Sequence, residues 1–129
     1  MKVEPFKNAS FTDFAKPENR QAMSEAVTQV RSQLGRTYDI VIGGEKIRCE
    51  QQFESLNPSS REEVVGIFQK GTSQLAEQAI KAADSAFLAW SRRPAEERVE
   101  LMLKVSRIMK ERRFELAAWM VIEVGKSWV

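Results

Sequence analysis

The sequence predicts a mainly helical chain that also contains a β-hairpin and one or two further short strands. Apolar residues recur at three- and four-residue steps in four segments, which is the spacing of one face of a helix. A β-branched run followed by two glycines indicates a hairpin. The 129 residues are 43% hydrophobic and 29% charged, which fits one small globular domain or a piece of a larger one.

Residues 1–16 are expected to form an extended arm that lies along a surface, because their phenylalanines have no helical or strand period. A partly disordered terminus is the alternative. Residues 17–35 predict the first helix, with Pro17 and Glu18 in its first turn and Gly35 as its C-terminal cap. The apolar stripe of this helix consists of Ala22, Met23, Ala26, Val27, Val30 and Leu34.

Residues 39–70 predict β structure. Residues 40–42 and 45–49 form the two arms of the hairpin around Gly43-Gly44. Residues 53–56 and 63–68 predict further strands, and Asn57-Pro58 begins the turn between them. Gly66 within the last strand indicates a bulge or a close backbone approach.

Residues 72–126 predict three helices. The first begins after a cap at Thr72 or Ser73 and ends near Trp90, the second covers residues 94–111, and the third covers 114–124 with Gly125 as its cap. The apolar residues of 94–111 are too many for one stripe, which predicts burial on more than one side. We expect segments 73–90 and 94–111 to need more apolar cover than this chain supplies.

Several kinds of chemistry are excluded by composition. The chain has no histidine and one cysteine, Cys49, so it has no histidine base, no histidine metal ligand, no intrachain disulfide and no multi-cysteine zinc site. Cys49 is the only strong nucleophile candidate, and it lies next to Arg48 in the sequence. A structural or incidental thiol is expected, because no histidine base is present and the position is a hairpin strand. The net charge of +2 does not indicate nucleic-acid binding.

The remaining motifs also predict no site. Adjacent glutamates on a helix, such as Glu96-Glu97, point about 100° apart and form no acid/base pair, and the other glutamates, such as Glu62-Glu63, are expected on a solvated face. Gly125-Lys126-Ser127 resembles the end of a phosphate-binding loop, but Met120 stands where its first glycine belongs. We therefore predict no catalytic, cofactor-binding or metal residue. No apolar run approaches the roughly 20 residues of a membrane span, and a cytoplasmic location is expected.

Several short motifs follow one another along the chain: Ile42-Gly43-Gly44, Asn57-Pro58, Val65-Gly66, an alanine-rich helix ending at Trp90, Glu97-Arg98 with Leu101, and Gly125-Lys126. Their order and spacing resemble the N-terminal region of the aldehyde dehydrogenase superfamily. Further segments are similar to the 1-pyrroline-5-carboxylate dehydrogenases, also called L-glutamate γ-semialdehyde dehydrogenases. They are Glu4-Pro5-Phe6, Phe11-Thr12-Asp13-Phe14, Glu18-Asn19-Arg20 and Gly125-Lys126-Ser127-Trp128.

The resemblance implies an α/β, aldehyde dehydrogenase-like fold, of which residues 1–129 are an N-terminal segment and an incomplete cofactor-binding domain. It implies NAD-dependent oxidation of L-glutamate γ-semialdehyde to L-glutamate in proline catabolism. In the family a cysteine thiolate attacks the aldehyde, hydride passes to NAD and a glutamate activates the hydrolytic water. These residues lie beyond position 129, so the segment alone is expected to be inactive and not to bind NAD.

The expected partners are the remainder of the same enzyme or other copies of the chain, bound through the apolar helix faces. The full-length family forms homo-oligomers, and no nucleic acid or membrane partner is expected. Two alternatives remain open: a non-catalytic helical interaction module derived from an aldehyde dehydrogenase, and a nucleic-acid accessory domain that uses Arg92-Arg93 and Arg112-Arg113. The preference between NAD and NADP also stays open, as does whether the native chain ends at Val129.

Overall fold

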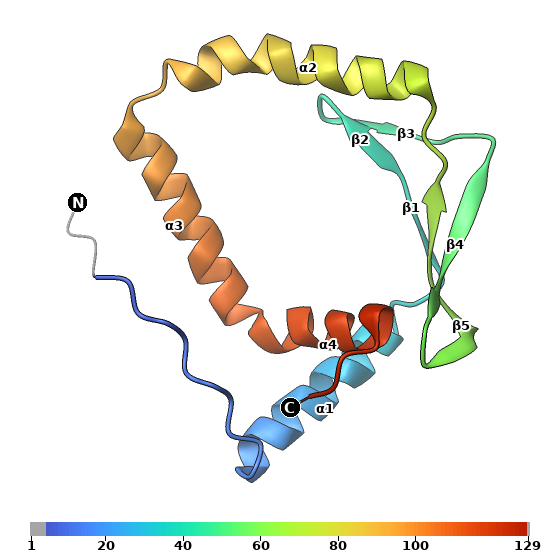
Figure 1. Cartoon of the computed structure of the whole chain (residues 1–129), viewed down its shortest axis with the longest axis vertical. Coiled ribbons are helices and arrows are strands. Elements are labelled where there is room, and N and C mark those ends of the chain that lie inside the picture. Colours follow the sequence, from blue (N-terminus) through green and yellow to red (C-terminus); the bar gives the residue numbers. More distant parts are fainter. Residues whose placement is uncertain (1–4, 129) are drawn as a thin grey trace.

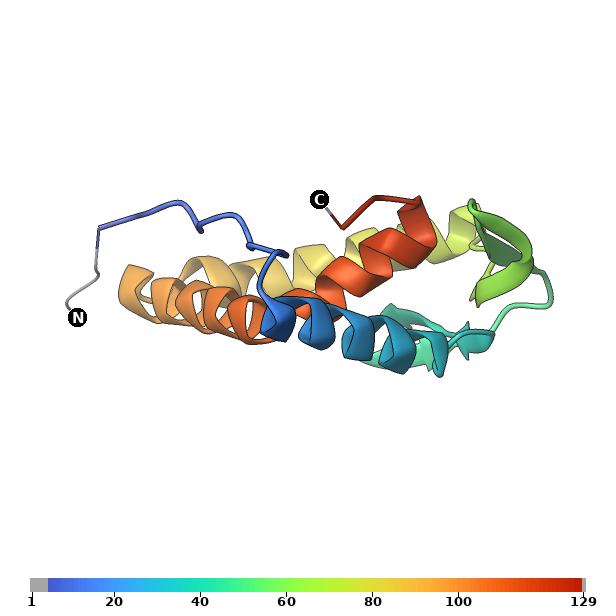
Figure 2. The same cartoon turned by 90° about the horizontal axis from the view of Figure 1, so that it is seen from below.

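The chain folds into an open, flattened ring of helices and strands, seen face-on in Figure 1 and edge-on in Figure 2. The computed structural model describes residues 5–128, so Glu4 and Val129, for which the sequence raised expectations, lie outside the described residues. The helices are α1 (Pro17–Arg31), α2 (Ser73–Ser91), α3 (Ala95–Glu111) and α4 (Arg113–Val124). The strands are β1 (Arg36–Tyr38), β2 (Ile40–Ile42), β3 (Glu45–Ile47), β4 (Gln52–Asn57) and β5 (Ser60–Gln69).

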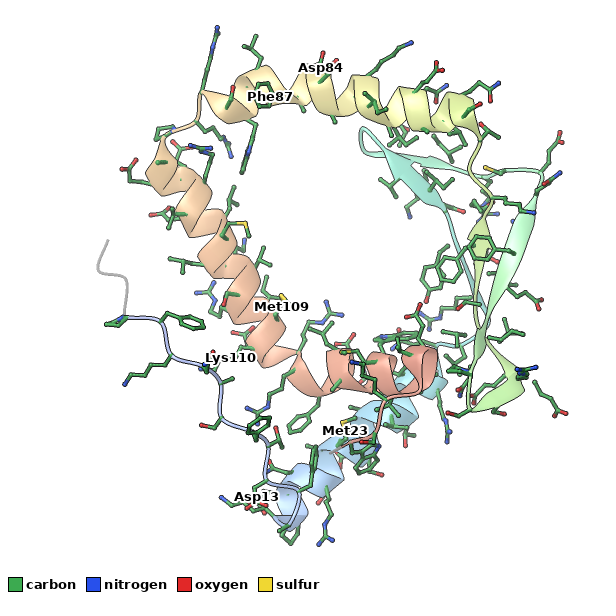
Figure 3. All side chains as sticks on the ribbon, viewed as in Figure 1. Asp13, Met23, Asp84, Phe87, Met109 and Lys110 are labelled. Atoms are coloured by element: carbon green, nitrogen blue, oxygen red, sulfur yellow. The ribbon has the colours of Figure 1, made fainter. Side chains whose placement is uncertain are left out.

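The core of the molecule lies where α1 crosses α4. Its buried residues are Met23, Ala26 and Val30 of α1, Ala118 and Ile122 of α4, and Val65 of β5. The buried positions of α1 follow the predicted stripe, so that prediction is confirmed. Met23 lies between the two helices in Figure 3.

Two expectations for the N-terminal region are wrong. Gly35 does not cap α1, which ends at Arg31 with Ser32 as its C-cap. The backbone N–H of Gly35 instead donates to the carbonyl oxygen of Val64 over 2.9 Å. Its φ of 71° therefore serves the turn into β1. The described part of the arm also leaves Phe6 and Phe11 exposed, and only Phe14 packs against the core.

The strands form a three-stranded sheet and a separate hairpin. β1 pairs in parallel with β5, β4 pairs antiparallel with β5, and β2 pairs with β3 around Gly43-Gly44 as predicted. β1 was missed by the sequence reasoning. The close approach expected at Gly66 is confirmed, since a Cβ there would lie 3.0 Å from ring carbons of both Tyr38 and Phe68.

In Figure 1, α2 lies across the ring from the core, and α3 runs from the end of α2 to the start of α4. Their bounds match the prediction, and the Thr72 hydroxyl accepts the Leu75 N–H over 3.3 Å as an N-cap. The alanine-rich α2 approaches the hairpin, where a Cβ at Gly43 would lie 3.8 Å from Cβ of Ala82. The prediction that α3 is buried on more than one side is not met within the described residues, where neither α2 nor α3 has a buried residue.

Candidate functional site

The candidate site is an interaction surface, which we call the α2–α3 apolar surface. It comprises the large apolar side chains of these helices that remain exposed: Ile80, Phe87, Leu88, Trp90, Val99, Leu101, Met102, Leu103, Val105, Ile108 and Met109. The exposed fractions of Phe87 and Met102 are 63% and 64%. An exposed apolar surface of this extent is typical of an interaction site.

A shallow groove of about 420 Å³ lies at the junction of the two helices. Trp90 closes it from the α2 side, and Val99, Met102 and Leu103 line it from α3. Arg98 also lines this groove, and its Nε is buried without a hydrogen-bond partner among residues 5–128. The groove thus combines an apolar lining with one unsatisfied cationic donor.

A stack of aromatic rings forms a second exposed apolar area on the three-stranded sheet. The ring centroids of Tyr38 and Phe68 lie 5.2 Å apart, and those of Phe53 and Phe68 lie 5.7 Å apart. Tyr38 and Phe53 remain exposed. Sequence reasoning missed this stack because it depends on the pairing of β1 and β4 with β5; the aromatic residues themselves were its only signal.

Cys49 lies between the hairpin and β4, where it is half-buried with a free thiol. Its backbone N–H donates to Oε1 of Gln69 over 2.9 Å. It borders a pocket that it shares with Glu50, Gln51, Lys70, Gly71 and Thr72. This setting contains a carboxylate and an ammonium group but no histidine, which the whole sequence lacks.

The glutamates considered in the sequence are distributed over separate elements, and three of them contact arginine side chains. Glu63 lies 3.6 Å from Nε of Arg31 and accepts a hydrogen bond from Asn57, while Glu97 lies 3.6 Å from Nε of Arg93. Glu115 accepts from Nε of Arg112 over 2.8 Å. That hydrogen bond is the largest effect on the pKa of the Glu115 carboxyl and holds it below its usual value; desolvation opposes it, and the positive charge of Arg112 adds a smaller lowering effect.

The arginine clusters also have local contacts. The guanidinium of Arg113 lies over the ring of Phe114, 4.7 Å from its centroid, and Arg112 and Arg93 form the ion pairs just described. Within residues 5–128, no group of three or more Cys, Asp or Glu side chains is arranged to hold a metal ion. None of the helices in this part of the chain is long and apolar enough to cross a membrane.

Comparison of the sequence with known proteins identifies the family of this chain. The profile of the aldehyde dehydrogenase family matches residues 46–129, and the chain belongs to that family. A 1-pyrroline-5-carboxylate dehydrogenase from Geobacillus thermodenitrificans is 42% identical over 126 residues, which are 98% of this chain and 24% of that protein. The corresponding enzyme of Geobacillus kaustophilus is also 42% identical, with the same coverage.

Solved structures of 1-pyrroline-5-carboxylate dehydrogenases and related enzymes also resemble this chain. The 1-pyrroline-5-carboxylate dehydrogenase from Thermus with bound NAD has a TM-score of 0.94 and 45% identity, over 100% of this chain and 25% of that one. Proline utilization A from Bdellovibrio bacteriovorus has a TM-score of 0.92 and 35% identity, over 99% of this chain and 14% of that one. The resemblance predicted from the motifs is confirmed, and the chain spans about a quarter of the length of the curated relatives it matches.

The described residues do not fit a dinucleotide such as NAD. A dinucleotide site needs a glycine-rich turn between a strand and a helix that packs back on the same parallel sheet. Here the β5–α2 connection contains only Gly71, and α2 approaches the separate hairpin instead of the sheet. The described residues therefore do not form a dinucleotide site of this type.

Proposed function

We propose that this chain is the N-terminal structural segment of an NAD-dependent 1-pyrroline-5-carboxylate dehydrogenase. The complete enzyme oxidises L-glutamate γ-semialdehyde to L-glutamate in proline catabolism. The observation that carries the proposal is the α2–α3 apolar surface in a chain that matches about a quarter of such an enzyme. The segment contributes no catalytic, cofactor-binding or metal residue, and the remaining three quarters supply them.

The energetics of the long helices support this role. Helices of this length gain most of their stability from packing of an apolar face, yet α2 and α3 have no buried residue in the described chain. Full burial of a fully exposed large apolar side chain gains about 1.5–3 kcal/mol, and side chains that are 39–69% exposed, as these are, gain a part of that. Covering the eleven side chains of the α2–α3 apolar surface would thus contribute a large part of the stability of the complete enzyme.

The same proposal includes assembly and location. The complete enzyme forms homo-oligomers in the cytoplasm, where a free thiol such as Cys49 stays reduced. The segment acts there as part of the packed interior and not as a separate catalyst. Its partners are the later segments of the enzyme, with neither a nucleic acid nor a membrane involved.

Complementation tests the proposal. The chain is co-expressed with the Geobacillus thermodenitrificans relative from which the matching 126 residues have been removed. We expect the two polypeptides to co-purify and to produce NADH from L-glutamate γ-semialdehyde, whereas neither polypeptide alone does so. NADH production by the chain alone, or failure of the two polypeptides to associate, would contradict the proposal.

The α2–α3 apolar surface also favours a second candidate, a non-catalytic interaction module derived from an aldehyde dehydrogenase. Under this alternative the surface binds a partner without completing an active site. A complex that co-purifies, binds NAD and remains inactive under the same assay would favour the module over the enzyme segment.

A further inference from the structure

Arg98 stands out among the basic residues of the long helices. It lies in the first turns of α3, lines the groove beside Trp90 and Met102, and has its Nε shielded from water. No carbonyl or carboxylate oxygen within residues 5–128 accepts from that Nε. A shielded guanidinium donor without an acceptor is costly, so this position requires an explanation.

Its own helix cannot supply an acceptor. The residues one turn away, at three and four positions before and after Arg98, are Pro94, Ala95, Leu101 and Met102, and none has a polar side chain. The preceding Glu97 is occupied by Arg93 at 3.6 Å. The acceptor must therefore come from a polypeptide that approaches the groove from outside.

We propose that Arg98 is the polar anchor of the α2–α3 apolar surface and binds a carboxylate side chain presented by the later segments of the enzyme. This inference rests on the proposed function, which identifies the covering polypeptide. Its basis is the length of the relatives, since three quarters of their chain has no counterpart here. A carboxylate is favoured over a carbonyl because a hydrogen bond between a guanidinium and a carboxylate is charge-assisted and therefore stronger.

A contact at Arg98 would fix the alignment of the covering segment along α2 and α3. Apolar contacts over α2 and α3 are non-directional and tolerate sliding, whereas a guanidinium–carboxylate pair fixes one alignment. Arg98 lies at the corner where the two helices meet, so a single pair there positions the covering segment against both helices at once. Arg98 is accordingly a positioning residue and takes no part in the chemistry.

The test measures the affinity of this chain for the shortened Geobacillus relative used above. Arg98→Met keeps the length and apolar stem of the side chain and removes its charge, Arg98→Glu reverses the charge, and Arg107→Met is the matched control at an exposed arginine of α3. We expect Arg98→Met to weaken binding at least about tenfold, Arg98→Glu to weaken it further, and Arg107→Met to leave it unchanged. Circular dichroism of each free chain should be unaltered, because Arg98 Nε has no partner within the described residues.

The possible outcomes distinguish the role of Arg98 from the proposal that the chain is a segment of the enzyme. If the wild-type chain binds the shortened relative and Arg98→Met binds it equally well, Arg98 is not the anchor, but the proposal that the chain is an enzyme segment stands. Equal losses for Arg98→Met and Arg98→Glu overturn the carboxylate. If the wild-type chain does not bind the shortened relative, both proposals are wrong. If Arg98→Met weakens only the association of the chain with copies of itself, the partner of Arg98 is a second copy of the chain, and the proposed contact with the later segments is wrong.

Discussion

Gln69 donates a hydrogen bond from its side-chain Nε2 to the backbone carbonyl of Tyr38 over 3.1 Å, which joins β5 to the end of β1. Oε1 of the same side chain accepts from the Cys49 backbone N–H at 2.9 Å and from Gln52 at 3.2 Å. One buried amide therefore ties together the three-stranded sheet and the chain leaving the hairpin.

Replacing this amide should destabilise the sheet. In Gln69→Ala the Cys49 N–H loses its acceptor and the Tyr38 carbonyl loses its donor, and each lost hydrogen bond costs about 0.5–1.5 kcal/mol. Urea denaturation followed by circular dichroism measures the loss. Gln78→Ala on the exposed surface of α2 is the control and should change the free energy of unfolding by less than about 0.5 kcal/mol. Equal stabilities for the two variants would contradict the role assigned to Gln69.

The core between α1 and α4 allows a matched comparison of two methionines. Met23 is 1% exposed and Met120 is 47% exposed. Met23→Ala should reduce the free energy of unfolding by about 2–5 kcal/mol, because it removes buried methylenes and leaves a cavity. Met120→Ala should cost less than about 1 kcal/mol. Similar losses in thermal or urea unfolding would mean that the core lies elsewhere.

Gly125 ends α4 with a φ of 68°, and a Cβ at this position would lie 3.1 Å from Cγ of Pro58. Gly125→Ala therefore combines the left-handed backbone strain of about 1 kcal/mol with a steric contact. Gly35→Ala is the control, since its φ is 71° with no atom within 4 Å of the added Cβ. We expect Gly125→Ala to be the more destabilising of the two in urea unfolding, and the reverse order would count against the Pro58 contact.

The Arg112–Glu115 pair predicts a pH dependence of stability. Glu115 has a pKa below its usual 4.5 in the folded chain because of the hydrogen bond and charge of Arg112. The contribution of Glu115 to the free energy of unfolding is therefore complete above its usual pKa and is lost as the pH falls through its lowered pKa. The difference in unfolding free energy between wild type and Glu115→Gln should be constant near neutral pH and shrink in acid. A difference that grows on acidification would exclude this assignment.

The α2–α3 apolar surface predicts that the chain by itself associates with copies of itself or strongly binds a hydrophobic dye. The double variant Phe87→Lys with Met102→Lys should reduce both effects and retain its helical circular dichroism, because both side chains are exposed. A sharp cooperative melt from a clean wild-type monomer that binds no dye would refute this expectation.

Local patterns predicted most of the secondary structure, because caps, glycine turns and helical periodicity act within a few residues. They placed α1 to α4, the β2–β3 hairpin, β4 and β5, the stripe containing Met23 and Val30, and the surplus apolar surface of α2 and α3. The motif order also indicated the aldehyde dehydrogenase family, which the comparisons confirm.

Only the tertiary structure decided the features that depend on partners distant in sequence. The parallel pairing of β1 with β5 converted Gly35 from an expected helix cap into a turn and brought Tyr38 beside Phe68. Packing at the corner of α2 and α3 left Arg98 shielded without an acceptor. Periodicity shows which side chains need cover, but the direction of approach of the neighbouring elements decides which of them receive it.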